Sequence, residues 1–298
     1  MNVSSTLIAA AGQAVIIDTF ASPRHLQPFA EFIETASELA ADSRVAWATG
    51  IWVVYTHSDW DHCLGTGAIE DAFGPAGVGR IVSHCLTRRR MEEQGTKDIQ
   101  RLARVNPSLV EGARVVLPNI TFSQKACLHL NREPLHRNSC HIAQAEGDNQ
   151  LAEAHDFQGQ ASCCTLELTH VGGHTPDSVT CYIPEQKVLV AGDLVEDPIP
   201  SVTDPSGLDK WIQCLEYYAE ITGVVVPSHG EVQGPEILKR NARYLRSLKE
   251  LAERPGKDAA PLCKVDPEAS RIIDSLGPGQ KESYLGIHKG NVRVLTQG

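Results

Sequence analysis

The chain contains, directly after the apolar run 51–56, the hexapeptide His57-Ser58-Asp59-Trp60-Asp61-His62. The run predicts a buried strand. Imidazole nitrogens and carboxylate oxygens at the end of a rigid strand can converge on metal ions with little further ordering cost. The alternative is a polar turn in which Asp61 only caps the following helix. Histidine occupies 12 of the 298 positions, so two His and two Asp within one hexapeptide favour the metal-binding interpretation.

Three later segments repeat this pattern, because each is a short strand-like run followed by a ligand-type residue. The runs are 166–169, 188–191 and 224–226, and the residues that follow them are His174, Asp193 and His229. Glycines beside these residues let the backbone turn sharply or approach closely. Any one segment alone would be read as an ordinary strand-end turn. Together with the hexapeptide, they favour a metal centre.

In this order, the segments resemble the motifs of the metallo-β-lactamase superfamily: H-x-H-x-D-H, then a His, then an Asp, then a His. The resemblance spans about residues 1–250 and is specific in its combination of motifs. It implies an α/β fold, the four-layer αββα sandwich, with two divalent metal ions at one edge of its two sheets. It also implies the ligands: a first metal on His57, Asp59 and His174, a second on Asp61, His62 and His229, and Asp193 bridging both.

The sequence departs from the family pattern at Asp59, which stands where the second His is usual. Three carboxylates against two divalent ions leave a formal charge of about +1, and a bridging hydroxide brings the site to about zero, whereas with His the site would keep about +1. We therefore expect a weaker electrophile and a preference shifted toward oxygen-liking ions such as manganese or iron, with zinc as the default metal. The shorter Asp side chain also predicts a displaced or weakly held first metal.

The resemblance implies hydrolysis by a metal-bridging hydroxide, formed from water whose pKa falls toward ~7 on the metals. Asp61 or Asp193 would orient the hydroxide and relay its proton. The leading interpretation is cleavage of an ester-like bond, in a lactone, thioester, amide or β-lactam. The alternative is an iron-dependent persulfide dioxygenase on the same fold, because Asp59 raises the oxygen content of the site. A binding protein with a degraded site is disfavoured, since Asp59 can still coordinate a metal.

The charge composition of the chain limits the classes of molecule that it is expected to bind. The formal net charge of -10 argues against an extended nucleic-acid surface, and a small-molecule substrate remains. The basic cluster Arg88, Arg89 and Arg90 is interpreted as a solvated helix face.

The sequence shows neither an apolar run long enough to cross a membrane nor a secretory signal, so the expected location is cytoplasmic. The nine cysteines are irregularly spaced and expected to be mostly reduced, and the oligomeric state stays open.

We predict a catalytic domain over residues 1–250 and a C-terminal extension over 251–298 that packs on it. Apolar spacing predicts an N-terminal hairpin and helices over 26–41, 86–103, 208–221 and 235–251. Periodicity fades near 121–160, which is interpreted as an irregular insertion, a loop or lid carrying His129, His136, His141 and His155. His84, at a strand end, is favoured as a structural histidine, and His170 is left open as a second partner of the metal ligands.

Overall fold

The computed structural model describes residues 3–10, 13–29, 31, 51–77, 79–131, 140–146, 150–157, 163–253 and 261–297. The chain divides into two compact units. The N-terminal unit comprises Asn2–His170 and Cys181–Gln186. The C-terminal unit comprises Met1, Val171–Thr180 and Lys187–Gly298. The predicted division into a domain over 1–250 and an extension over 251–298 stays a prediction.

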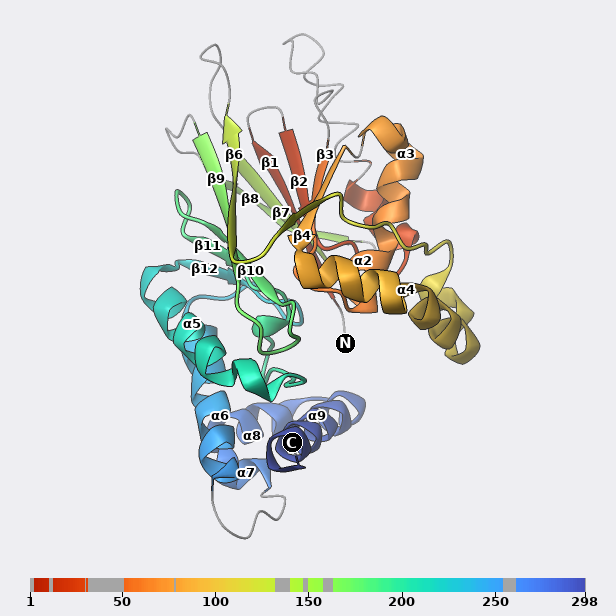
Figure 1. The fold of residues 1–298 in the computed structure, drawn as a ribbon. Coiled ribbons are helices and arrows are strands. Elements are labelled where there is room, and N and C mark those ends of the chain that lie inside the picture. Colours follow the sequence, from red (N-terminus) through yellow and green to blue (C-terminus); the bar gives the residue numbers. More distant parts are fainter. Residues whose placement is uncertain are drawn as a thin grey trace. The chain divides into compact units, whose positions relative to one another are not determined.

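The N-terminal unit is built on a seven-stranded sheet with the strand order β5-β4-β3-β2-β1-β7-β8 (Figure 1). Its strands are β1 (Ser4–Ala10), β2 (Gln13–Ile17), β3 (Ile51–Val54), β4 (Arg80–His84), β5 (Ile120–Phe122), β7 (Cys140–Glu146) and β8 (Gln150–Phe157). The predicted N-terminal hairpin is confirmed, since β1 and β2 pair antiparallel. From β2 to β5 the neighbouring strands are parallel, so their carboxyl ends meet at one edge of the sheet.

The interpretation of residues 121–160 as an irregular insertion is wrong. The segment contains β7 and β8, and it also contains β6 (Lys125–Asn131), which pairs antiparallel with β9 (Cys163–His170). β7 pairs antiparallel with β1 over its whole length, and β8 pairs with β7. Alanine, glutamine and glutamate give β7 and β8 little intrinsic strand preference, and pairing along the buried β1 overrides that preference. The side chains of His136, His141 and His155 lie outside the described residues.

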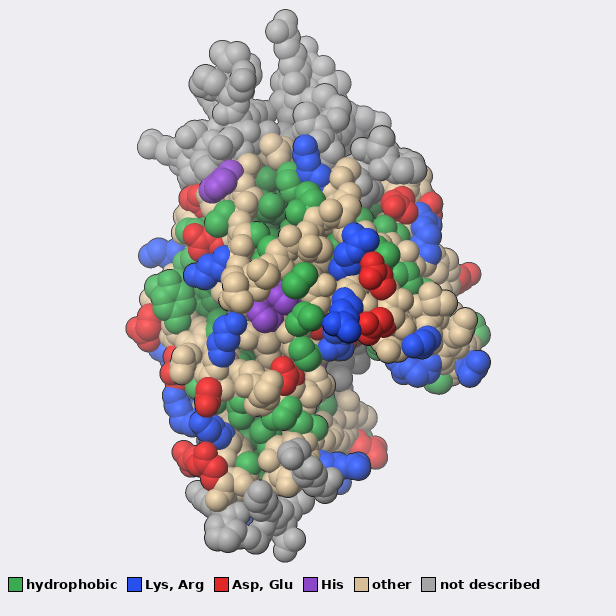
Figure 2. Space-filling view, viewed as in Figure 1, with side chains coloured by type: hydrophobic (Ala, Val, Ile, Leu, Met, Phe, Trp, Pro, Cys, Tyr) green, Lys and Arg blue, Asp and Glu red, His purple; other side chains and the backbone are tan. Residues whose placement is uncertain are grey.

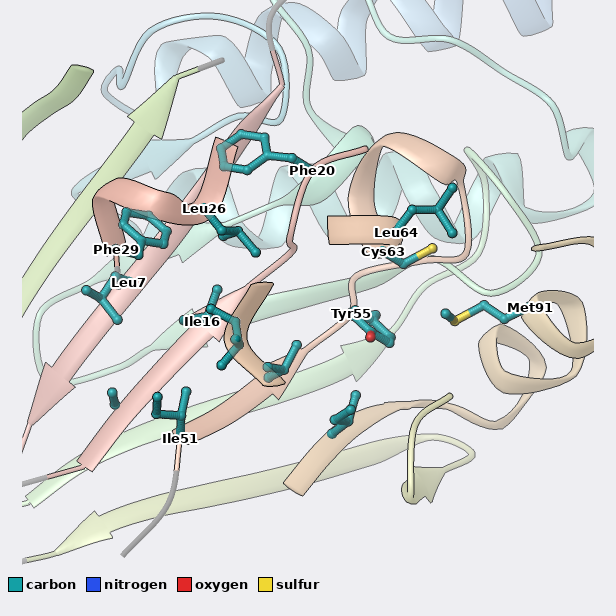
Figure 3. Close-up of a cluster of buried hydrophobic side chains, with 14 of the residues drawn as sticks. Leu7, Ile16, Phe20, Leu26, Phe29, Ile51, Tyr55, Cys63, Leu64 and Met91 are labelled. Atoms are coloured by element: carbon teal, nitrogen blue, oxygen red, sulfur yellow. The ribbon is translucent and has the colours of Figure 1, made fainter. Parts of the chain in front are cut away.

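A cluster of buried hydrophobic side chains forms a core within the N-terminal unit (Figure 3). Ile16 and Val53 project from the central strands into this core and are fully buried. Leu64 and Met91 reach it from the short helices after β3 and from the long helix after β4. Among its described residues, the helices are η1 (Pro23–Leu26), α2 (Trp60–Cys63), η3 (Leu64–Thr66), α3 (Gly67–Gly77), α4 (Cys85–Val105) and η4 (Pro107–Val110). The helix expected over 86–103 is thus confirmed, and the one over 26–41 falls mostly outside the described residues.

The C-terminal unit contains the parallel pair β11 (Val188–Val190) and β12 (Val224–Val226), followed by helices. The expected helices over 208–221 and 235–251 are confirmed as α5 (Leu208–Ile221) and α6 (Glu236–Ala252). Residues after 260 form α7 (Leu262–Val265), α8 (Pro267–Ser275) and α9 (Pro278–Gln297), and α9 packs against α6 and α8 (Figure 1). Short 3-10 turns are η5 (Gly192–Leu194) and η6 (Pro205–Gly207).

The class of fold is confirmed as α/β with two sheets. The second sheet has five strands, namely β6, β9, β10 (Val179–Ile183), β11 and β12. Seven of the nine cysteines are described with their side chains, and these are free thiols: Cys63, Cys85, Cys127, Cys164, Cys181, Cys214 and Cys263. Among the described residues, no helix combines the length and the apolar character that a membrane span requires.

Candidate metal centre

The hexapeptide forms the turn between β3 and α2, in the N-terminal unit. His57 and His62 are almost fully buried, and their ring centroids lie 4.2 Å apart. Nε2 of His57 lies 3.6 Å from Oδ2 of Asp59, and Nε2 of His62 lies 4.0 Å from Oδ1 of Asp61. Asp59 is the residue at the N-cap position of α2, so the alternative in which Asp61 caps the helix is wrong. The structure therefore brings these four predicted ligands together.

Asp18, at the end of β2, fixes this turn, and no motif in the sequence marks it as part of the site. Its Oδ1 accepts a hydrogen bond from the backbone nitrogen of Thr56 at 2.8 Å, and its Oδ2 accepts one from the Thr56 hydroxyl at 2.6 Å. The same Oδ2 lies 2.8 Å from Nδ1 of His62. Because β2 and β3 are parallel, Asp18 follows the neighbouring strand at the same edge as the hexapeptide. A buried carboxylate on the second nitrogen of a histidine is typical of metal sites, where it orients the ring.

Arg90 of α4 also reaches the hexapeptide. Its Nη2 lies 3.7 Å from Oδ1 of Asp59, and both side chains are about one third exposed. Its two neighbours form ion pairs within α4, Arg88 with Glu92 and Arg89 with Glu93. The solvated-face interpretation therefore fits Arg88 and Arg89 but is wrong for Arg90. Figure 2 shows such Lys and Arg side chains interspersed with Asp and Glu.

The C-terminal unit positions the other three predicted ligands. Asp193 follows β11 in the 3-10 turn η5, and His229 follows β12. Oδ2 of Asp193 lies 3.3 Å from Nε2 of His174 and 3.8 Å from Nε2 of His229. All three side chains are buried. Nδ1 of His174 lies 2.8 Å from the carbonyl oxygen of Ser201, which fixes the ring so that Nε2 points to Asp193.

Glycine is required beside two of these ligands. Gly192, with φ +53°, and Gly173, with φ +98°, adopt the left-handed backbone conformation that glycine favours. At Gly173 an added Cβ would lie only 2.7 Å from the Trp211 ring, so a side chain there would push α5 away. Gly192 thus allows the sharp turn after β11 that places Asp193. Gly173 allows the turn in the segment 171–180 that places His174.

Glu196 is a further candidate that the sequence did not reveal. One donor atom each of His174, Asp193 and Glu196 lies within 4.8 Å of the other two. Glu196 is buried, and burial is the largest cause that raises the pKa of its carboxyl, while His229 and His174 oppose the rise. Its Oε1 accepts a hydrogen bond from the backbone nitrogen of Ser201 at 2.9 Å. No sequence motif distinguishes Glu196 as a site residue, so it could not be predicted from its position three residues after Asp193.

The structural interpretation of His84 is supported. Its Nδ1 accepts a hydrogen bond from the backbone nitrogen of Leu86, which caps α4, and its Nε2 lies 3.0 Å from the carbonyl oxygen of Ser123. The His170 ring stacks on the His84 ring with centroids 3.8 Å apart. Both His84 nitrogens thus contact the backbone, which supports a structural role for His84, and the role of His170 stays a prediction.

The residues present fit a divalent metal. In each unit, imidazole Nε2 atoms point toward carboxylate oxygens, and His62 and His174 are held through Nδ1 by an oxygen atom. Buried His and Asp are the usual ligands of zinc, and they also suit manganese and iron. The complete set of seven ligands and the identity of the metal stay predictions.

The chain is similar to known proteins in its sequence and in its fold. The family model described as the metallo-beta-lactamase superfamily matches residues 1–230. A similar solved structure is a metallo-beta-lactamase from Pontibacter korlensis, 23% identical, covering 80% of this chain and 85% of that one, with a TM-score of 0.45. Another is the stereoselective inverting sec-alkylsulfatase Pisa1 from Pseudomonas sp., 19% identical, with a TM-score of 0.54; the match covers 98% of this chain and 46% of that one. A search of curated proteins gave no significant match.

Proposed function

Because the chain belongs to the metallo-beta-lactamase superfamily, we propose that it is a metal-dependent hydrolase that cleaves an ester-like bond in a small molecule. The observation that carries the proposal is the orientation of the histidines. In both units a buried imidazole has Nδ1 held by an oxygen and Nε2 directed at a carboxylate, as in His62 and His174. Such preorganisation serves a metal ligand and has no evident use in packing alone.

The proposed centre binds two divalent ions. His57, Asp59 and His174 would hold the first, Asp61, His62 and His229 the second, and Asp193 both. When bound, the metals would supply Lewis acidity and lower the pKa of water toward ~7. Asp61 and Asp193 would orient the attacking water through their carboxylates and accept its proton. Zinc is the proposed metal, with manganese or iron as alternatives because Asp59 adds an oxygen donor.

The proposed substrates are small molecules, in keeping with the net charge of -10 and with the mixed charges on the surface in Figure 2. Lactones, thioesters, amides and β-lactams remain the candidate classes. The fold likeness to a sec-alkylsulfatase extends over 98% of the chain, which adds alkyl sulfate esters to the classes worth testing. The proposed location is cytoplasmic.

The test combines metal analysis with a substrate panel. Protein purified without added metal is analysed for its elements, and then assayed with zinc, manganese and iron on esters, lactones, thioesters, a phosphodiester, a cephalosporin and an alkyl sulfate. We expect hydrolysis of at least one class and its loss in His62→Ala. The matched control is His129→Ala, because His129 is exposed on β6.

Two results would contradict the proposal. A folded wild type that binds no divalent metal and cleaves no member of the panel would overturn it. Oxygen uptake with a persulfide, together with bound iron and no hydrolysis, would replace it by the dioxygenase alternative.

A further inference from the structure

The last helix of the chain, α9, contacts the loop 196–203 of the C-terminal unit through two buried polar side chains. Asn291 is 1% exposed and Tyr284 is 6% exposed. Both lie beyond residue 230, where the match to the superfamily model ends. The loop carries Ser201, whose carbonyl oxygen contacts the proposed ligand His174.

Asn291 binds the backbone on both sides of Ser201. Its Oδ1 accepts a hydrogen bond from the nitrogen of Val202 at 2.8 Å, and its Nδ2 donates one to the carbonyl oxygen of Pro200 at 2.8 Å. The Nδ2 also donates to the Tyr244 hydroxyl of α6 at 3.1 Å. An amide held at both ends in this way has one orientation, so it fixes the position of the Ser201 peptide.

The Ser201 peptide in turn contacts two groups of the candidate centre. Its carbonyl oxygen lies 2.8 Å from Nδ1 of His174, and its nitrogen donates to Oε1 of Glu196 at 2.9 Å. His174 donates through Nδ1 in this geometry, so in the neutral ring Nε2 carries the lone pair and faces Asp193, as a metal ligand requires. A shift of the peptide would rotate the ring or change its tautomer.

Tyr284 makes a parallel connection to the second histidine of this unit. Its hydroxyl donates to the carbonyl oxygen of Asp197 at 2.5 Å, and the nitrogen of Asp197 donates to the carbonyl oxygen of His229 at 2.9 Å. Gly230, next to His229, has φ +120° and closely approaches Asp197, so the contact tolerates little displacement. Two side chains of α9 thus each reach one proposed ligand through one loop residue.

We propose that Asn291 is a positioning residue of the metal centre, acting through the Ser201 peptide on His174, with Tyr284 acting in the same way through Asp197 on His229. This inference rests on the proposed function, because it assigns a role toward the same metals. It makes α9 part of the functional unit of this enzyme. The competing explanation is that α9 only adds stability to the C-terminal unit.

Val292 allows the two explanations to be separated. It is the next residue of α9 and 4% exposed, so Val292→Ala loosens the packing of the helix and leaves both polar connections in place. Asn291→Ala removes the hydrogen bonds between Asn291 and the loop 196–203. Tyr284→Phe removes a single hydroxyl without changing the shape of the ring. Asn291→Asp keeps an acceptor for the Val202 nitrogen and loses the donor to Pro200.

The experiment measures the affinity for zinc of the full-length protein by competition with a chromophoric chelator, and the absorption spectrum of the cobalt-loaded form. The melting temperature of each variant is recorded alongside. We expect Asn291→Ala to weaken the affinity for metal about 10- to 100-fold and to change the cobalt spectrum, because lost support of a ligand typically has effects of that order. Asn291→Asp and Tyr284→Phe should weaken the affinity for metal less. Val292→Ala should lower the melting temperature and leave the affinity for metal unchanged.

The outcomes are distinguishable. If the wild type binds no metal, the proposed function fails and the inference fails with it. If the wild type binds metal and Tyr284→Phe and both Asn291 variants keep its affinity and spectrum, the inference alone is overturned. Should Asn291→Ala fail to fold, the isosteric pair Asn291→Asp and Tyr284→Phe decides by the same two measurements. Weakening by Val292→Ala to the same degree as by Asn291→Ala would establish the stability explanation instead.

Discussion

Oδ2 of Asp18 lies 2.8 Å from Nδ1 of His62, and both side chains are buried. The carboxylate can only accept, so His62 donates through Nδ1, and in the neutral ring the lone pair of Nε2 is directed toward Asp61. A residue at the end of β2 thereby selects the tautomer of a proposed ligand after β3. The two residues are 44 positions apart in the chain and meet because the two strands are parallel neighbours.

Asp18→Asn should therefore weaken metal binding while preserving the fold. With its oxygen accepting from the Thr56 nitrogen, the new amide group would face Nδ1 of His62 and force the proton onto Nε2, where the metal would bind. Asp18 has φ +61°, a conformation that asparagine tolerates well. We expect a loss of affinity of about 10- to 100-fold, measured by titration against a metal chelator.

The control for this variant is Asp71→Asn, which changes an exposed carboxylate paired with Arg114. It should leave the affinity for metal unchanged. If Asp18→Asn binds metal as tightly as this control, the orientation argument for His62 is wrong.

Much of the centre could be predicted because ligand-type residues stand directly after short apolar runs, as in the hexapeptide and at His229. Three residues could not be predicted from the sequence, because each is a single polar residue outside any motif: Asp18, Glu196 and Asn291. Their roles come from tertiary contacts: Asn291 lies 89 positions from Val202, which it binds. The strand β7 was missed for a related reason, since its Ala and Gln residues form a strand only by pairing with β1.

Arg90→Gln is predicted to tighten metal binding. The ion pair with Asp59 is about one third exposed on both sides, so its loss should cost no more than about 1 kcal/mol. Two unit charges about 4 Å apart interact by about 1 kcal/mol in water and by about 4 kcal/mol at an effective dielectric of about 20, and a divalent ion doubles either value. Removing the guanidinium therefore favours a cation on Asp59 more than it disorders the carboxylate, and we expect about a tenfold gain in affinity.

The net charge of the side chains gives the direction of this effect. Asp59, Asp61 and Arg90 carry a formal sum of about -1, which becomes about -2 in Arg90→Gln. The affinity for metal, measured by chelator competition, should therefore be higher in this variant than in the wild type. Arg89→Gln is the matched control, because Arg89 pairs with Glu93 in the same helix. Weaker binding in Arg90→Gln than in this control would show that Arg90 acts by positioning Asp59.

Asn241→Ala should destabilise the C-terminal unit. Asn241 of α6 is fully buried, its Oδ1 accepts from the nitrogen of Glu196 at 3.0 Å, and its Nδ2 donates to the carbonyl oxygen of Glu196 at 3.0 Å. Truncation leaves a buried donor and a buried acceptor unsatisfied, at about 1–3 kcal/mol each. We expect the free energy of unfolding in urea to fall by about 2–4 kcal/mol. Asn106→Ala, at the exposed N-cap of η4, should lose about 1 kcal/mol; an equal loss in the two variants would contradict this account.

Cys214 of α5 should resist alkylation far above neutral pH. Burial raises the pKa of its thiol to about 12, and the thiolate is the nucleophile, so about one molecule in ten thousand is reactive at pH ~8. In native protein the rate with iodoacetamide should rise about tenfold for each pH unit up to the highest pH at which the fold persists. The exposed Cys127 and Cys263 provide the comparison within the same protein.

The raised pKa of the Cys214 thiol also makes the protein less stable as the pH rises into the alkaline range. Between about pH 9 and about pH 12 the unfolded chain loses the Cys214 proton and the folded chain keeps it, so the free energy of unfolding falls as the pH rises. Below about pH 8.5 both states are protonated and the contribution is constant. Cys214→Ala should therefore flatten the alkaline decline measured by urea unfolding, relative to Cys263→Ala. Labelling of Cys214 in the native protein at pH ~8 at the rate of Cys127 would show that its thiol is accessible and not shifted.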